Sequence, residues 1–168
     1  MSAYAEQINV QIQQAVQLAH ELAIEHGITL ATAESLTGGD LAGTICTVSG
    51  ASAYFMGGVV SYASSVKASV LGVSETLLAQ AGSVDARVAQ QMAAGAARVC
   101  GASYALSTTG VAGPEPHDGK PVGTVFIGLS TPEGVIAREY SFAGDRAAIR
   151  AQSVLSALTL LIESLSFH

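Results

Sequence analysis

The stretch from Gly27 to Asp40 constrains the fold more than any other part of the sequence. Residues 28–33 form a short apolar run that follows a glycine and contains threonine, which predicts a buried strand. Thr37-Gly38-Gly39 then leads into apolar residues at helical spacing, so a helix is expected to begin there. Ser35 therefore lies where a strand ends and a helix begins. In open α/β sheets, ligands bind at that edge.

This turn has two interpretations, and the stretch alone leaves both open. Backbone N–H groups at a helix start can hold an anion or a developing oxyanion, and Gly38 and Gly39 permit close approach of a substrate. The alternative is a plain strand-to-helix turn in which Ser or Thr caps the helix. Glu34 precedes Ser35, and it either orients a site or is a solvated charge.

Hydrophobic periodicity predicts the remaining elements. The expected helices cover 4–26, 39–47 and 85–99 (capped by Ser83), with short helices after Lys67 and from Ser74 and a last helix from Asp145. The other expected strands cover 54–62, 102–108, 123–130 and 135–142, and 115–121 is expected to be a polar surface loop. Strands separated by helices, then a hairpin and a closing helix, predict an α/β fold. We expect one domain over residues 1–168, a three-layer α/β/α sandwich with a mixed sheet.

Composition excludes several functional classes. Hydrophobic residues make up 49% of the 168 residues and charged residues only 12%, which is typical of a globular domain. The net charge of -6 argues against a general nucleic-acid or anionic-membrane binder. The two cysteines and four histidines show no metal-ligand spacing, so no metal is expected, and buried thiols suit a reducing cytoplasm. Neither a signal peptide nor a membrane span is expected.

Polar residues follow three of the expected strands, in the segments 34–39, 62–67 and 109–114. If these segments converge on one sheet edge, they supply a hydroxyl, a base and phosphate-binding backbone. Lys67 is one of only two lysines, the other being Lys120. A lysine buried beside a strand end loses proton affinity and can act as a general base towards a serine. Tyr62 is a candidate to relay that proton, although tyrosines at strand ends usually pack and helix lysines usually face water.

Two further patterns leave alternatives open. Ser64-Ser65-Val66-Lys67 matches the S-x-x-K spacing of penicillin-binding enzymes, which makes Ser64 a rival nucleophile, but no S-D-N or K-T-G sequence follows. Arg146 and Arg150 lie one helical turn apart. They can hold a phosphate or carboxylate together, or form surface ion pairs of little energetic value.

Five sequence blocks in order resemble the CinA C-terminal domain family. They are Ala33–Gly39, Gly57–Tyr62 with Lys67, Thr109–Pro114, Pro121–Val125 and Gly144–Arg150, and the resemblance extends from about residue 6 to 165. It implies a three-layer α/β/α fold and a cytoplasmic nicotinamide-nucleotide amidase. Such an enzyme hydrolyses nicotinamide mononucleotide to nicotinate mononucleotide and ammonia, in pyridine-nucleotide salvage. The resemblance also implies no cofactor or metal, a small-molecule nucleotide as the substrate, and homo-oligomers.

By position, the resemblance implies that Ser35 is the nucleophile and that Lys67 and Tyr62 activate it. The implied substrate-binding residues are Glu34, Thr37, Gly38, Gly39, Thr109, Gly110, Gly113, Arg146 and Arg150.

The chain departs from the family pattern at three places. Ser64 replaces a common asparagine, Leu36 replaces a frequent cysteine, and residues 115–119 replace a glycine-rich loop. The N-terminal domain of full-length CinA has no counterpart in this chain, so the stand-alone form is expected. Two rival hypotheses remain: a non-catalytic nucleotide-binding or regulatory paralogue, and an amidase for another small amide.

Overall fold

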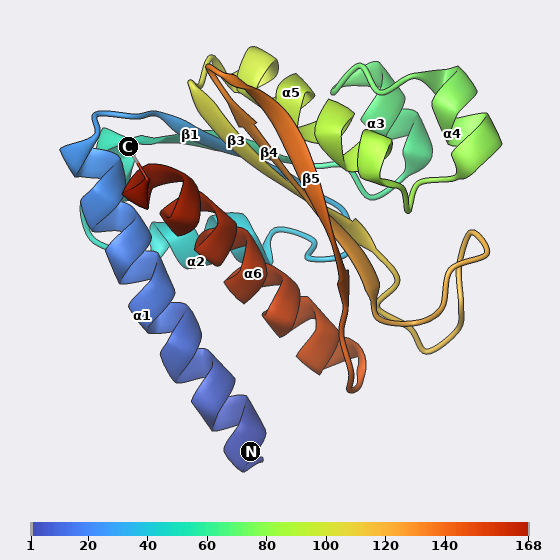
Figure 1. The fold of residues 1–168 in the computed structure, drawn as a ribbon, viewed down its shortest axis with the longest axis horizontal. Coiled ribbons are helices and arrows are strands. Elements are labelled where there is room, and N and C mark those ends of the chain that lie inside the picture. Colours follow the sequence, from blue (N-terminus) through green and yellow to red (C-terminus); the bar gives the residue numbers. More distant parts are fainter. Residues whose placement is uncertain (1, 168) are drawn as a thin grey trace.

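The structure is a computed structural model that describes residues 2–167, and its centre is one five-stranded sheet (Figure 1). The strands, in the spatial order β2-β1-β3-β4-β5, are β2 (Phe55–Val60), β1 (Leu30–Glu34), β3 (Tyr104–Gly110), β4 (Thr124–Thr131) and β5 (Gly134–Ser141). β2 and β3 run parallel to β1, whereas β4 and β5 pair in antiparallel fashion. The expected mixed sheet is confirmed.

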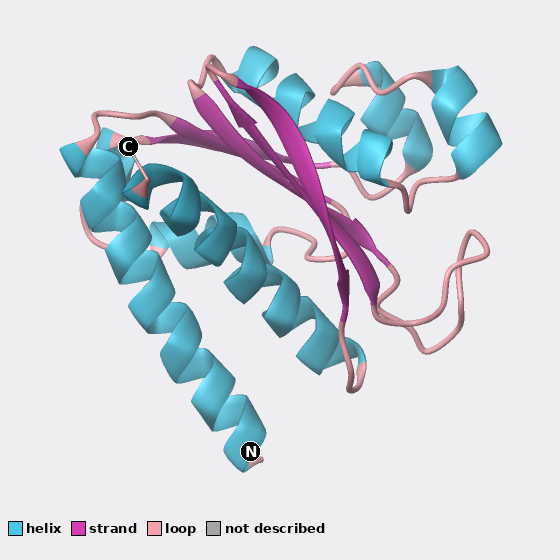
Figure 2. Cartoon of the chain, in the orientation of Figure 1, coloured by secondary structure: helices cyan, strands magenta, loops and turns pink. Residues whose placement is uncertain are grey.

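Helices cover both faces of the sheet, as Figure 2 shows. The helices are α1 (Ala3–Glu25), α2 (Asp40–Cys46), α3 (Ser64–Ser69), α4 (Glu75–Ala81), α5 (Ala86–Cys100) and α6 (Arg146–Ser166), with a 3-10 turn at Ala51–Ala53. One core cluster joins α1, α2 and α6 to the sheet, and a second joins α4 and α5 to the opposite face. The three-layer α/β/α domain is therefore confirmed.

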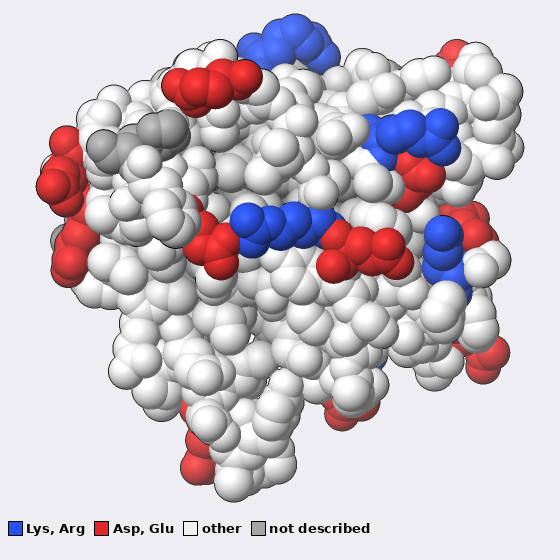
Figure 3. All heavy atoms as spheres, viewed as in Figure 1, with Lys and Arg blue, Asp and Glu red and all other residues white. Residues whose placement is uncertain are grey.

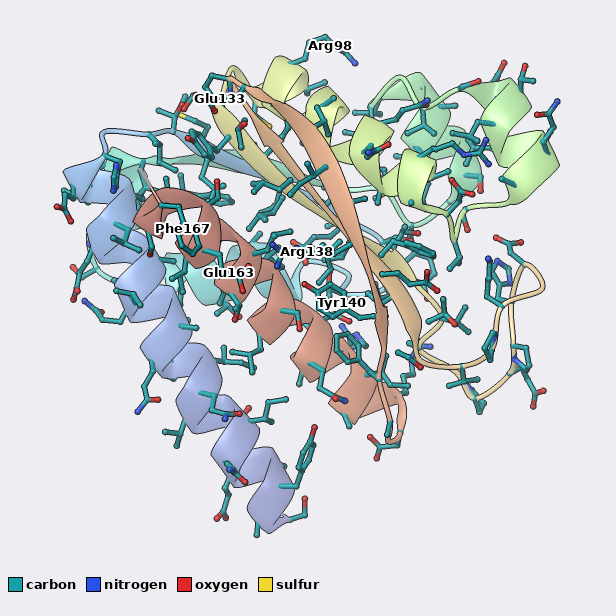
Figure 4. All side chains as sticks on the ribbon, viewed as in Figure 1. Arg98, Glu133, Arg138, Tyr140, Glu163 and Phe167 are labelled. Atoms are coloured by element: carbon teal, nitrogen blue, oxygen red, sulfur yellow. The ribbon has the colours of Figure 1, made fainter. Side chains whose placement is uncertain are left out.

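The α6 helix is the main packing element of the first layer. Its apolar stripe, including Ile149, Leu158 and Leu161, is buried against the sheet and α1. Within residues 2–167, it is the one helix that is both long and apolar enough to cross a membrane, but core helices of globular proteins share these properties. On the outer side, Glu163 of α6 forms an ion pair with Arg138 of β5 (Figure 4).

The parallel strands β2, β1 and β3 bring the three polar segments to the same end of the sheet, where the carboxyl ends of these strands lie. Glu34, the last residue of β1, aligns with Val60 of β2 on one side and with Thr108 of β3 on the other. The loops after β1 and β2 therefore begin next to each other, and β3 continues two residues further before its loop begins. The expected convergence of the segments 34–39, 62–67 and 109–114 is confirmed.

Helix caps depart from expectation at one place. Ser83 does not cap the helix that follows it, because α5 begins at Ala86 and the side chain of Asp85 accepts a hydrogen bond from the N–H of Arg87. Ser83 instead donates both its N–H and its hydroxyl to the carboxylate of Asp118, in the loop between β3 and β4. The last helix begins next to Asp145, as predicted, and the Asp145 side chain caps it by accepting from the Ala148 N–H.

Candidate active site

Ser35 is held at a sharp turn between β1 and α2. Its N–H donates to the Thr108 carbonyl of β3, and its own carbonyl accepts from the Gly38 N–H. Gly38 and Gly39 have φ values of 59° and 106°, a region that favours glycine. These two residues let the chain reverse within a few residues, which leaves the half-buried Ser35 side chain directed into a cleft.

Glu34 is a buried cap for α2. Only 1% of the residue is exposed, and its carboxylate accepts hydrogen bonds from the Thr37 hydroxyl at 2.7 Å and from the Leu41 and Ala42 N–H groups at 2.8 and 3.0 Å. An anion at a helix N-terminus satisfies unpaired amides and interacts favourably with the helix dipole. The interpretation of Glu34 as a solvated charge is therefore wrong.

The Glu34 cap limits which backbone N–H groups at the helix start can hold an oxyanion. The N–H of Gly39 donates to the Glu34 carboxylate at 3.2 Å, and the N–H of Gly38 donates to Ser35. Both groups are already engaged, so they are not free to stabilise an oxyanion. Within residues 2–167, the N–H of Leu36 has no acceptor, and Leu36 lines the cleft. The residue after a nucleophile on such a turn commonly supplies this donor.

Lys67, on α3, reaches Ser35 from a fully buried position. The residue is 1% exposed, and its Nζ lies 3.0 Å from the Ser35 Oγ. The same Nζ donates to the carbonyls of Ser61 at 2.7 Å and Tyr62 at 3.0 Å. Burial lowers the pKa of Lys67 from 10.5 to about 8, and the charge of Asp118 opposes this shift in part.

The three contacts of Lys67 suit a base. A neutral amine has two N–H groups and one lone pair, whereas the ammonium form has three donors. If the Ser61 and Tyr62 carbonyls accept the two N–H groups, the lone pair faces the Ser35 hydroxyl. The side chain can therefore accept a proton from Ser35 without moving.

The other candidate groups around Lys67 lie in different places. Ser64 is exposed at the start of α3, and Lys67 contacts Ser35 rather than Ser64. The Tyr62 hydroxyl accepts from Arg146 at 3.1 Å, so this side chain is engaged at the exposed rim. Tyr62 reaches Lys67 only through its main-chain carbonyl.

The two arginines of α6 make contacts in different parts of the structure. Arg146 is exposed, donates to the Gly113 carbonyl at 2.8 Å and lines the cleft. Arg150 points the other way: it donates to the Leu36 and Thr37 carbonyls at 3.0 Å and pairs with Asp40 at 2.8 Å. The structure does not bring the two guanidinium groups together as one anion site, because Arg150 holds the turn that carries Ser35.

The cleft between these loops has a volume of about 300 Å³. Ser35, Leu36 and Tyr62 line it together with Arg146 and the 110–117 loop, which includes the predicted Gly110 and Gly113. Two other predicted residues lie beneath the surface. Thr109 is buried and donates to the Ser83 carbonyl, and Thr37 is buried against Glu34 and Thr108.

Sequence reasoning missed four residues around the cleft. Ser61 contributes a carbonyl to Lys67, a role for which no residue type is a signal. Ser83 and His117 line the cleft, and Asp118, with a φ of 51°, joins their two loops by accepting from Ser83. An Asp-Gly pair is typical of such a turn, so Asp118-Gly119 was the available signal. Within residues 2–167, no group of three or more His, Cys, Asp or Glu side chains is placed to hold a metal ion.

This site defines a class: a serine on a strand-to-helix turn with a buried lysine as its partner. Comparisons with known proteins show the family to which this chain belongs. The CinA C-terminal domain family matches residues 12–165. A CinA-like protein of Frankia casuarinae is 55% identical over 140 residues, covering 83% of this chain and 32% of the relative. A putative competence-damage inducible protein of Desulforamulus reducens is 47% identical over 144 residues, covering 86% of this chain and 35% of the relative.

Solved structures show the same fold. A CinA superfamily protein from Klebsiella pneumoniae superposes with a TM-score of 0.90 at 33% identity, covering 94% of this chain and 99% of that one. A competence/damage inducible protein from Agrobacterium tumefaciens gives a TM-score of 0.88 at 34% identity, covering 93% of this chain and 96% of that one. The chain belongs to the CinA C-terminal domain family. It spans about a third of the length of the curated relatives it matches.

Proposed function

We propose that this chain is an amidohydrolase that converts nicotinamide mononucleotide to nicotinate mononucleotide and ammonia. The observation that carries the proposal is the 3.0 Å contact between Lys67 Nζ and Ser35 Oγ, in a position where burial brings the pKa of the lysine to about 8. A base of that pKa is partly neutral at physiological pH, as general-base activation of a serine requires. The substrate follows from the resemblance to nicotinamide-nucleotide amidases.

The reaction proceeds by acyl transfer. Ser35 Oγ attacks the carboxamide carbon as Lys67 takes its proton, and the Leu36 N–H stabilises the negative oxygen. Lys67 then returns the proton to the amide nitrogen, the carbon–nitrogen bond breaks, and ammonia leaves. Water attacks the Ser35 ester, again giving a proton to Lys67, and the acid departs as Ser35 recovers its hydrogen.

Arg146 is the proposed partner of the substrate phosphate. It lines the cleft, and its contacts with the Gly113 carbonyl and the Tyr62 hydroxyl leave further N–H donors of the guanidinium group. Arginine suits phosphate because its donors match two oxygens at once. Glu115 also lines the cleft, and its negative charge favours the cationic pyridinium ring. A phosphate at the α2 N-terminus is disfavoured because Glu34 occupies it.

The test is ammonia release from nicotinamide mononucleotide by the purified chain without added metal. Ser35→Ala removes the attacking oxygen, and we expect it to abolish release while keeping the fold. Ser64→Ala is the matched control, because Ser64 is an exposed serine on the Lys67 helix and its removal should leave the rate unchanged.

Other outcomes would point elsewhere. Loss of activity in Ser64→Ala, with Ser35→Ala active, would contradict the assigned nucleophile. Release from another small amide but not from the mononucleotide would retain the chemistry and refute the substrate. Binding of the mononucleotide with no ammonia release would favour a regulatory paralogue.

A further inference from the structure

The segment between β3 and β4 forms a long loop that projects from the end of the sheet (Figure 1), and residues 110–117 of it line the cleft. The tip of this loop is a tight turn, in which the main chains of His117 and Lys120 exchange hydrogen bonds at 3.2 and 2.9 Å. Asp118 lies inside the turn with a φ of 51°, and within residues 2–167 it is the one non-glycine residue with a positive φ. Such a conformation persists where surrounding contacts hold it.

The contacts that hold Asp118 come from Gly82 and Ser83, between α4 and α5. The Asp118 Oδ2 accepts from the Ser83 N–H at 2.7 Å and from the Ser83 hydroxyl at 2.9 Å. Gly82 has a φ of 74°, and a Cβ there would lie 2.6 Å from the Asp118 Cγ, so glycine is needed to leave room for the carboxylate. The Ser83 carbonyl in turn accepts from the buried Thr109 hydroxyl of β3 at 2.7 Å. The tip of the loop is therefore fastened through Ser83 to the sheet.

Asp118 differs from an ordinary surface charge. Most aspartates are solvated, and charged side chains of both signs are visible on the right of Figure 3, the side on which the loop projects. The side chain of Asp118, in contrast, is only 25% exposed. Burial raises its pKa, but the Ser83 hydrogen bonds and the charge of His117 more than offset this rise, so the pKa lies below the ordinary value. The carboxylate is therefore a fixed negative charge at neutral pH.

A fixed negative charge matters here because of what happens to Lys67. When Lys67 takes the proton of Ser35, it becomes a cation in a buried position, which is costly without a compensating charge. Within residues 2–167, none of the ion pairs includes Lys67. The charge of Asp118 nevertheless acts on Lys67 and favours its protonated form. Ser83, which holds Asp118, lines the same cleft as Ser35, which contacts Lys67.

We propose that Asp118 is a positioning residue of the active site: it anchors the loop as one wall of the cleft, and its negative charge stabilises the cation that Lys67 becomes on accepting the Ser35 proton. The catalytic consequence rests on the function proposed for the cleft, whereas the anchor and the effect on Lys67 do not depend on any substrate. Asp118 lies in the segment 115–119, where this chain departs from the family pattern, so the family resemblance does not imply this role.

Two variants separate the charge from the anchor. Asp118→Asn removes the charge, while its amide oxygen can still accept both bonds from Ser83, and asparagine tolerates a positive φ. Ser83→Ala keeps the charge and removes one of the two bonds. The matched control is Glu139→Gln, which removes the same charge from an exposed residue of β5. All three variants retain the other ionisable side chains of the cleft lining, which are Tyr62, Glu115, His117 and Arg146.

The test is NMR titration of the Lys67 side chain in the free protein, with hydrogen exchange of the Ser83 amide. In Asp118→Asn, Lys67 should lose its proton at a lower pH than in the wild type, because the compensating charge is gone. Ser83→Ala and Glu139→Gln should both keep the wild-type titration. The Ser83 amide should be protected from exchange in the wild type and in Asp118→Asn, because its acceptor is present in both.

The kinetics of ammonia release should follow the same division. In Asp118→Asn, the inflection of the pH–rate profile should move to lower pH, and kcat above it should fall because the base is weaker. Ser83→Ala should keep the inflection and raise KM a few fold, because the wall of the cleft is less well held.

An unchanged Lys67 titration in Asp118→Asn, or an equal shift in Glu139→Gln, would overturn the role of the charge. Rapid exchange of the Ser83 amide in the wild type would overturn the anchor. Both measurements are made without substrate. A wild-type chain that releases no ammonia, with Lys67 shifted in Asp118→Asn, would therefore refute the proposed reaction while the action of Asp118 on Lys67 stands.

Discussion

The buried end of the cleft and its exposed rim hold their cations in opposite ways. Lys67 is 1% exposed and contacts one hydroxyl and two carbonyls, with no carboxylate among its hydrogen-bond partners. Arg146 is exposed at the rim, between the Gly113 carbonyl and the Tyr62 hydroxyl. Burial lowers the pKa of the lysine, so that it can lose its proton. The guanidinium of Arg146 stays charged at any relevant pH. In the proposed reaction, the buried end carries out proton transfer and the rim binds the anion of the substrate.

Replacement of the buried cation should have the largest effect. We expect Lys67→Met to lower kcat by about 10²- to 10⁴-fold, the range for loss of a general base. Lys120→Met is the control, because Lys120 is the other lysine of the chain and lies outside the cleft lining. Initial rates of ammonia release measure both. Near-normal turnover in Lys67→Met would remove proton transfer from this end of the cleft.

The pH dependence should report the same group. The pKa of Lys67 is lowered to about 8, so its neutral, reactive fraction rises as the pH rises. Below that pH, kcat/KM should fall about tenfold for each pH unit, and above it the rate should level off. Arg146→Ala should keep this inflection, because the rim does not set the pKa of the lysine. A rate that is flat between pH 6 and about 9 would contradict the assignment of Lys67 as the base.

Replacement of the rim cation should affect binding more than chemistry. We expect Arg146→Ala to raise KM for nicotinamide mononucleotide roughly tenfold or more, the value of a hydrogen bond to a charged group, with a smaller change in kcat. With nicotinamide riboside, which lacks the phosphate, the wild type and Arg146→Ala should have nearly the same KM. An equal loss for both substrates would mean that Arg146 does not contact the phosphate. Arg87→Ala, which removes an exposed arginine on α5, is the matched control.

The smallest effect is expected at Tyr62. Its hydroxyl contacts Arg146 and not Lys67, so Tyr62→Phe should change KM by a few fold, as for one neutral hydrogen bond, and leave kcat nearly unchanged. Steady-state kinetics separate the two parameters. A fall in kcat of about 10²-fold or more would instead return Tyr62 to the role of proton relay, and would place catalysis at the rim as well.

The sequence predicted the fold and the approximate position of the site for a clear physical reason. Hydrophobic periodicity and glycines located the strands and the long helices to within a few residues, and parallel strands necessarily bring their ends to one edge. The strand-to-helix turn at Ser35 and the rare lysine at position 67 are therefore expected near each other from the sequence alone, and in the structure they are in contact. The 3-10 turn at Ala51–Ala53 was not predicted, and α3 begins at Ser64, before Lys67 and not after it.

Side-chain direction could not be predicted from the same patterns. Arg146 and Arg150 share a helix face by spacing, but one faces the cleft and the other holds the Ser35 turn. Glu34 was not identified as a cap because it precedes the helix by six residues, beyond the usual N-cap position. The Ser61 carbonyl gave no signal, since main-chain acceptors are independent of residue type.

Lys67 can act as the base only if its side chain loses its proton near neutral pH, and NMR can measure this directly. The chain contains two lysines, so NMR of protein labelled in the lysine side chains should give two signals, and Lys120→Met assigns them without altering the cleft. We expect the Lys67 signal to titrate with a pKa of about 8. A Lys67 signal that titrates near the ordinary lysine pKa of 10.5 would contradict it, because the side chain would then be a permanent cation at the pH of the cell.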